Sequence, residues 1–120
     1  MNASNPFRRA MDWLSRSTED LDSEQSRRAA QASGAETVAD CHDRQRATLQ
    51  GRISVLTLRP RSGTPWLEAE FSDGSGTVSL IWMGRREIPG VIAGRELRVT
   101  GRVSWVDGRR RMYNPEYELL

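Results

Sequence analysis

After Gln45 the chain contains several runs in which apolar and polar residues alternate at every second position, and no other feature of the sequence constrains the fold as strongly. A two-residue repeat is the pattern of half-buried β-strands, because successive side chains of a strand point to opposite faces of the sheet. The alternation predicts five strands, over residues 46–58, 66–72, 77–83, 96–106 and 109–119.

Glycine, aspartate and proline mark the connections between these strands. Residues 73–76 and 107–108 each contain Asp-Gly between two alternating runs, which is typical of a tight β-hairpin turn. Residues 60–65 begin and end with proline and predict a turn-rich loop. Residues 84–94 contain three glycines and a proline and predict a loop with at most one helical turn.

Two glycines lie inside predicted strands rather than between them. Gly51 and Gly101 predict bulges or sharp bends. The apolar parity also changes after Val55, which predicts a register change in the first strand. Five strands with two bends in so short a segment fit a small, closed or partly closed barrel, and the five-stranded Greek-key OB barrel meets these conditions. The expected fold is therefore mainly β.

Residues 1–44 have a helical pattern and predict an N-terminal α-helical arm, whereas residues 45–120 form the barrel domain. One apolar stripe recurs at helical spacing; it consists of Phe7, Ala10, Met11 and Leu14. A second, almost entirely polar helix is predicted from Thr18 to Ala32, and residues 35–43 are either irregular or a short helix that caps another element. The stripe favours packing on the barrel or self-association over contact with a membrane.

Composition limits the class of protein. At 120 residues the chain is too short for a doubly wound nucleotide-binding enzyme or a TIM barrel. It has a single cysteine, no apolar run of about 20 residues and no secretory leader pattern, which predicts a cytoplasmic protein without a membrane partner. All 18 basic residues are arginine, and twelve of them stand against eight acids after residue 44. Arginine suits phosphate contacts and stacking.

Catalysis has few candidate residues. Cys41 and His42 form the single Cys/His pair, and neighbouring residues on a helix point about 100° apart. Zinc would need three or four convergent ligands. We therefore expect a half-buried cysteine and a solvated histidine, with no catalytic residue, metal or cofactor. Asp73 is expected to serve the hairpin turn by bonding its own backbone.

Three segments carry a resemblance to a known family. Residues 73–82 resemble the strand 2–3 hairpin of nucleic-acid-binding OB domains, and residues 94–103 resemble their fourth strand, with the pattern G-x-x-L-x-V-x-G-x-V. Residues 111–117 are similar to the closing strand of the OB wedge domain of the branched-DNA helicase RecG. Overall the chain resembles small stand-alone bacterial OB-fold nucleic-acid-binding domain proteins, which also carry the stretch at residues 82–90. A complete helicase is excluded because the chain has no Walker A motif.

The ligand groove of an OB barrel usually crosses strands 2 and 3, between the strand 1–2 and strand 4–5 loops. Basic residues alternate with aromatic ones at both predicted loops, as single-strand binding requires. We expect the nucleic-acid-binding residues to be Arg52, Arg59, Arg61, Trp66, Ile81, Met83, Arg85, Arg86, Arg102, Trp105, Arg109, Arg110, Arg111 and Tyr113. The alternative is a solvated, arginine-rich hairpin tip, with the tryptophans plugging the ends of the barrel.

Several positions in this set have a second interpretation. Trp82 shares parity with the core residues and favours packing over stacking, so its neighbours Ile81 and Met83 are expected to be exposed. Arg85 and Arg86 either clamp phosphate or pair with nearby glutamates, Glu87 and Glu96.

Two functions follow from these patterns. The first is a non-enzymatic module that binds single-stranded DNA or RNA through arginine–phosphate contacts and aromatic stacking, with little sequence specificity. The second is a protein-interaction OB module, because Glu68 and Glu70 place negative charge on the face that would meet phosphate. In that case the arm and the exposed apolar face would dock a protein partner.

Overall fold

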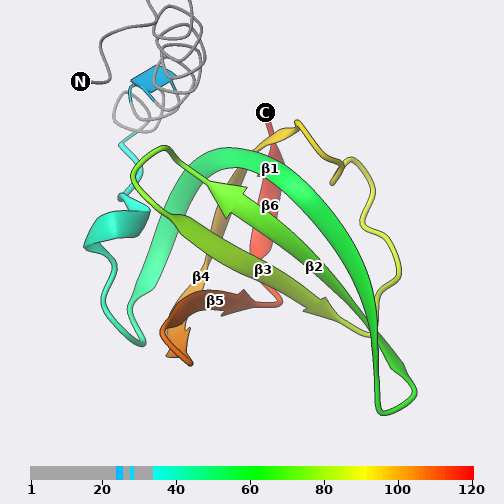
Figure 1. Ribbon diagram of the computed structural model, residues 1–120. Helices are drawn as coiled ribbons and strands as arrows, with labels where there is room; N and C mark the ends of the chain where they lie inside the picture. Colours follow the sequence, from blue (N-terminus) through cyan, green and yellow to red (C-terminus); the bar gives the residue numbers. More distant parts are fainter. Residues whose placement is uncertain (1–23, 26–27, 29–33) are drawn as a thin grey trace, which may run out of the picture.

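The computed structural model describes residues 24, 25, 28 and 34–120, and this part of the chain is mainly β-sheet (Figure 1). The strands are β1 (Arg46–Arg61), β2 (Thr64–Ser72), β3 (Thr77–Met83), β4 (Glu96–Val106), β5 (Arg109–Tyr113) and β6 (Glu116–Leu119). They follow the order β1-β2-β3-β5-β4-β6, and β1 also pairs with β4. Five strands thus close a ring, with β6 outside it, which confirms the predicted barrel.

β1 belongs to both sides of the barrel because it bends at Gly51. Its first part pairs with β4 and its second part with β2, and the change of partner occurs at Arg52. A Cβ atom at Gly51 would collide with the backbone carbonyl of Ser72 and lie 2.9 Å from Cζ of Phe71. The predicted bend is confirmed, and its physical requirement is a residue without a side chain.

The register change in β1 is also present, but its position corrects the prediction. The β1–β2 pairing shifts between Ile53 and Val55, which precedes the predicted point. Because a bulge inserts one extra residue, Val55 turns to the outer face and is 51% exposed instead of packing in the core.

The predicted loop over residues 60–65 is wrong, because the β1–β2 hairpin extends almost to its tip. Ser62 and Gly63 form the turn, with φ of 51° and 79°, and the prolines Pro60 and Pro65 lie opposite each other in the hairpin. Proline is tolerated at sheet edges and strand ends, where its missing N–H costs little. The prolines therefore do not break the strands.

The predicted fifth strand is divided in two. Asn114 adopts the left-handed conformation, with φ of 48°, and donates its backbone N–H to the carbonyl of Ile81 at 2.6 Å. Pro115, which follows, has no N–H to donate to a ladder. The chain turns here, and β6 pairs with β4 over Leu97–Thr100.

The barrel interior contains the inward side chains that the alternation predicted. On β2 and β3 these include Phe71, Val78 and Leu80, which are buried. Trp82 is buried as well, and its Nε1 donates to the carbonyl of Pro115 at 3.2 Å. The core interpretation of Trp82 is confirmed, and its polar atom is satisfied.

The segment before β1 covers one end of the barrel. Its short 3-10 helix η2 (Val38–Asp40) buries Val38 completely. The backbone N–H of Val38 donates to Oδ2 of Asp73 at 2.8 Å, while Oδ1 of Asp73 accepts from the backbone N–H groups of Ser75 and Gly76. Asp73 serves its own turn, as predicted, and in addition fixes the capping segment.

The N-terminal arm lies largely outside the described residues. Glu24, Gln25 and Arg28 have helical backbone, and Arg28 forms an ion pair with Glu24 at 2.7 Å. The predicted stripe from Phe7 to Leu14 and most of the predicted second helix fall outside the described residues, so the helical arm stays a prediction. No helix within the described part of the chain is long and apolar enough to cross a membrane.

Candidate functional site

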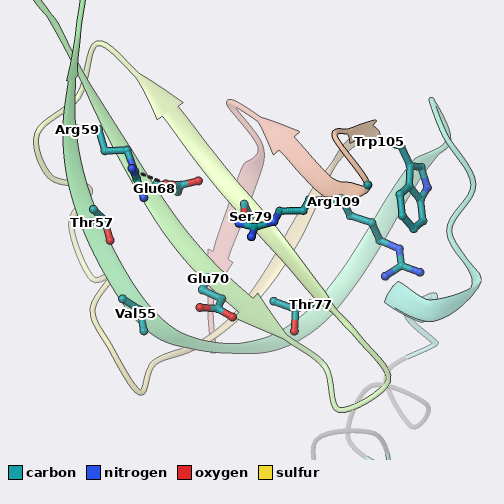
Figure 2. Close-up of a pocket in the computed structure, with 11 residues that line it drawn as sticks. Val55, Thr57, Arg59, Glu68, Glu70, Thr77, Ser79, Trp105 and Arg109 are labelled. Carbon is teal, nitrogen blue, oxygen red and sulfur yellow. Dashed lines mark hydrogen bonds and ion pairs between the residues drawn. The ribbon is translucent and has the colours of Figure 1, made fainter.

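A groove of about 510 Å³ crosses the outer face of β1, β2 and β3 and ends at the β4–β5 hairpin (Figure 2). Its floor consists of the outward side chains of the first three strands, and its wall consists of the hairpin. The lining residues are Val55, Thr57, Arg59, Glu68, Glu70, Thr77, Ser79, Trp105, Gly108, Arg109 and Arg110.

A smaller pocket of about 160 Å³ continues this groove toward the tip of the β1–β2 hairpin. It shares Arg59, Glu68 and Arg109 with the larger one. Its remaining lining residues are Arg61, Trp66, Ile81 and Arg111. The β1–β2 and β4–β5 hairpins therefore face one continuous surface, here called the groove, where the sequence placed it. Among the described residues that line it, five arginines stand against two glutamates.

One end of the groove contains Trp66 and two guanidinium groups, and Tyr113 packs against this tryptophan. Trp66 and Tyr113 meet edge to face, with ring centroids 6.3 Å apart, and Cζ of Arg61 lies 5.5 Å from the centroid of Trp66. Arg111 donates to the hydroxyl of Tyr113 at 3.4 Å, and this hydrogen bond raises the pKa of Arg111. These contacts order the side chains, and the arginine stays charged.

The other end carries an exposed tryptophan. Trp105 is 41% exposed and lies directly opposite Arg110 in the β4–β5 ladder. Cζ of Arg110 lies 4.5 Å from the centroid of the Trp105 ring, which is within the range of a cation–π contact. The backbone N–H of Trp105 donates to Asp43 at 2.9 Å, which ties the hairpin to the segment before β1. The hairpin thus presents an oriented, accessible indole.

The floor between these ends contains both glutamates of the groove, with Arg59 beside them. Nε of Arg59 donates to Oε2 of Glu68 at 2.7 Å, which neutralises that glutamate locally. Glu70 is exposed and lies opposite Val55 and Ser79 on the neighbouring strands. The two glutamates that favour the protein-interaction hypothesis therefore lie on this face, but the carboxylate of Glu68 is paired with Arg59.

The expectation that Ile81 is exposed is wrong. Ile81 points to the outer face, but only 2% of it is exposed, because it lies in register between Glu68 of β2 and Tyr113 of β5 and larger side chains cover it. Its neighbour Met83 is 39% exposed, as expected. A side chain can thus point outward and still be covered by its neighbours.

Six predicted site residues do not line the groove. Two of them, Met83 and Tyr113, are neighbours of the lining residue Trp66, and the other four are arginines. Arg52 donates to Glu96 at 3.4 Å, and Arg102 donates to the carbonyl of Arg44 at 2.9 Å. Arg85 and Arg86 are exposed in the loop after β3. Neither arginine forms an ion pair with Glu87 or Glu96 in the described part of the chain, and Glu96 pairs with Arg52 instead. Alternation alone could not assign these arginines to one face of a closed barrel.

Sequence reasoning missed several small groups of the floor. Thr57, Thr77 and Ser79 line the groove with hydroxyls. The alternation could have identified them, because they lie on the outer face of β1 and β3, as Glu68 and Glu70 do on the neighbouring β2.

The Cys/His pair is outside the groove. Cys41 is buried, and its thiol donates to the carbonyl of Thr37 at 3.3 Å. Burial, followed by the nearby charge of Glu36, raises the pKa of the Cys41 thiol. His42 is exposed. Across residues 34–120 and the three described arm residues, no group of three or more His, Cys, Asp or Glu side chains could hold a metal ion.

Comparison with known proteins gives a structural neighbour but no sequence family. No protein-family model matches the chain, and no curated protein does. Among solved structures, the chain is similar to RecG bound to a three-way DNA junction, with a TM-score of 0.61 and 25% sequence identity. The match covers 69% of this chain but only 12% of the RecG chain. The resemblance to RecG that the sequence indicated is confirmed, and the protein has an OB-like barrel similar to a small part of that helicase.

Proposed function

We propose that the protein is a non-enzymatic OB-fold module that binds single-stranded DNA or RNA in the groove, with little sequence specificity. The observation that carries the proposal is the convergence of both hairpins on one groove, which is lined by five arginines and two tryptophans among the described residues. Single strands are held by a positive channel for phosphates together with aromatic faces for bases.

Different residues of the groove would contact phosphates and stack on bases. Arg109 and Arg111 project from β5 on the same face as the floor and are available to phosphate oxygens. Trp105 offers an exposed face to a base, and Arg110 holds the ring in place. Base stacking of this kind tolerates any sequence, because every base has a flat face.

The comparison supports nucleic acid as the ligand class. The similar RecG structure is that of a protein bound to a three-way DNA junction. Because the chain covers 12% of RecG, the helicase's own activity is not carried over. We also propose that the protein acts in the cytoplasm.

A second candidate is a protein-interaction module. Glu68 and Glu70 lie in the floor, and the exposed apolar residues Val55, Leu58 and Met83 lie on the same hairpin or next to it. A protein partner with basic and apolar groups would fit this combination. The predicted arm would then be a further docking element.

Fluorescence titration distinguishes the two candidates. Trp105 is exposed, so binding in the groove should change tryptophan emission when single-stranded DNA or RNA is added at low salt. We expect saturable binding that weakens steeply as salt increases, because phosphate contacts release counterions. The absence of saturable binding to either polymer would reject the proposal and favour the protein-interaction module.

A further inference from the structure

The centre of the groove floor contains an unpaired carboxylate. Glu70 is flanked in register by Val55 of β1 and Ser79 of β3, and Figure 2 shows its side chain in the groove, beside Thr77. The carboxylate of Glu70 has no hydrogen bond or ion pair with any residue that the structure describes, whereas Glu68 is occupied by Arg59.

This carboxylate determines which part of a nucleic acid can approach the floor. A phosphate placed there would be repelled by Glu70, while Arg109 and Arg111 at the wall would attract it. A strand in the groove would therefore lie with its phosphates along the arginines and its bases toward β2. The hydroxyls of Thr57, Thr77 and Ser79 surround that position and suit polar base edges.

An ionised carboxylate can only accept hydrogen bonds, so it discriminates between base edges. The amino groups of cytosine, adenine and guanine are donors that it can use. Uracil and thymine present carbonyl oxygens at the corresponding position, and their single ring N–H lies between two such oxygens. A carboxylate next to these oxygens suffers repulsion in place of a hydrogen bond.

We propose that Glu70 gives the groove a preference for bases with an exocyclic amino group over uracil and thymine. The preference concerns a class of bases and not a sequence, and it rests on the proposed function, because the groove must first hold a single strand.

The sharpest probe is a pair of homopolymers, oligo(dC) and oligo(dU), of equal length, at equal salt and mildly alkaline pH. The two bases have the same ring size, and the two polymers have the same backbone. Cytosine carries an amino group where uracil carries a carbonyl, and the adjacent ring nitrogen bears a hydrogen only in uracil. We expect oligo(dC) to bind about fivefold or more tightly than oligo(dU), which corresponds to one base contact of ordinary strength.

Two variants assign the preference to a residue. Glu70→Gln keeps the size of the side chain and removes the charge, so it should bind oligo(dU) more tightly and lose most of the preference. Glu68→Gln removes the same charge two residues away on β2, where the carboxylate is already bonded to Arg59. This control variant should keep the preference for oligo(dC) over oligo(dU). Glu70 is exposed, so its substitution leaves the core intact, and retained binding of oligo(dC) reports a folded groove.

The outcomes separate this inference from the function on which it rests. Equal, saturable binding of both polymers by the unaltered protein would overturn the role of Glu70 and leave single-strand binding standing. A preference that survives in Glu70→Gln would also overturn it. Failure to bind either polymer would reject both the preference and the proposed function.

Discussion

At the scale of single residues, Asp73 stabilises the junction between the capping segment and the barrel. It is completely buried, and its two oxygens accept hydrogen bonds from the backbone of Val38, Ser75 and Gly76 and from the hydroxyl of Ser75. A buried carboxylate is tolerated when it is hydrogen-bonded in this way. Removal of the side chain would leave the buried N–H of Val38 and two part-buried N–H groups of the turn without their acceptor.

The substitution Asp73→Ala is therefore expected to lower the free energy of unfolding by about 2–4 kcal/mol, because unsatisfied buried donors are costly. Urea denaturation followed by tryptophan fluorescence measures the change. Asp107→Ala, in the exposed β4–β5 turn, is the matched control and should have a smaller effect. Similar losses in both variants would contradict the structural role of Asp73.

Cys41 makes the stability depend on pH in the alkaline range. Burial raises the pKa of its thiol, so the folded state holds the thiol proton more tightly than the unfolded chain. The stabilisation is complete at pH values below the ordinary thiol pKa and is lost as pH rises through the raised pKa. We expect Cys41→Ala to show a weaker alkaline decline in unfolding free energy. Parallel pH profiles for the variant and the unaltered protein would contradict this.

At the scale of elements, the two mid-strand glycines are not equivalent. A side chain at Gly51 would meet backbone of Ser72, which cannot move away. A side chain at Gly101 would meet the Met112 side chain, with its Cγ at 3.0 Å, and methionine adapts readily.

Gly51→Ala should therefore destabilise the barrel by about 2–3 kcal/mol, as overpacking does, and Gly101→Ala by less. Thermal unfolding monitored by circular dichroism compares the two variants directly. A larger loss at Gly101 would show that the bend in β1 does not limit the fold.

The β4–β5 hairpin should dominate the electrostatics of binding. Replacement of Arg109, Arg110 and Arg111 by alanine is expected to lower affinity at least about tenfold and to reduce the slope of log affinity against log salt by about 1–2. A variant with Arg52, Arg85 and Arg86 replaced removes the same charge outside the groove and should keep the slope. An unchanged slope in the hairpin variant would move the site elsewhere.

Much of the element structure is predictable from local pattern. Residues 77–83 and 96–106 form strands with the predicted bounds, because their alternation and flanking turns agree. The division after Tyr113 was not predictable, since the left-handed turn at Asn114 is stabilised by a hydrogen bond to β3, which is distant in sequence. Parity and turn position were enough to predict that Arg109, Arg110 and Arg111 lie together at the groove, and their role in binding stays a prediction. The burial of Ile81 was not predictable, because it depends on neighbours across two strands.

At the scale of the whole molecule, closure of the barrel gives the arginines two different environments. The β1–β2 and β4–β5 hairpins bring five of the described arginines to the groove. Arg52 and Arg102 lie on the β1–β4 side and contact Glu96 and a backbone carbonyl instead. The net charge of the chain cannot distinguish the arginines of the groove from those on the β1–β4 side. The candidate binding face is therefore determined by the topology of the barrel and not by composition.

The central claim is that the groove holds a single strand, and ultraviolet cross-linking tests it most directly. The protein is irradiated with a single-stranded oligonucleotide at low salt, and the cross-linked residues are identified by mass spectrometry. We expect cross-links at Trp105 and at the Trp66–Tyr113 pair, and their loss at high salt. Cross-links confined to the β1–β4 side, near Arg52 and Arg102, would contradict the account.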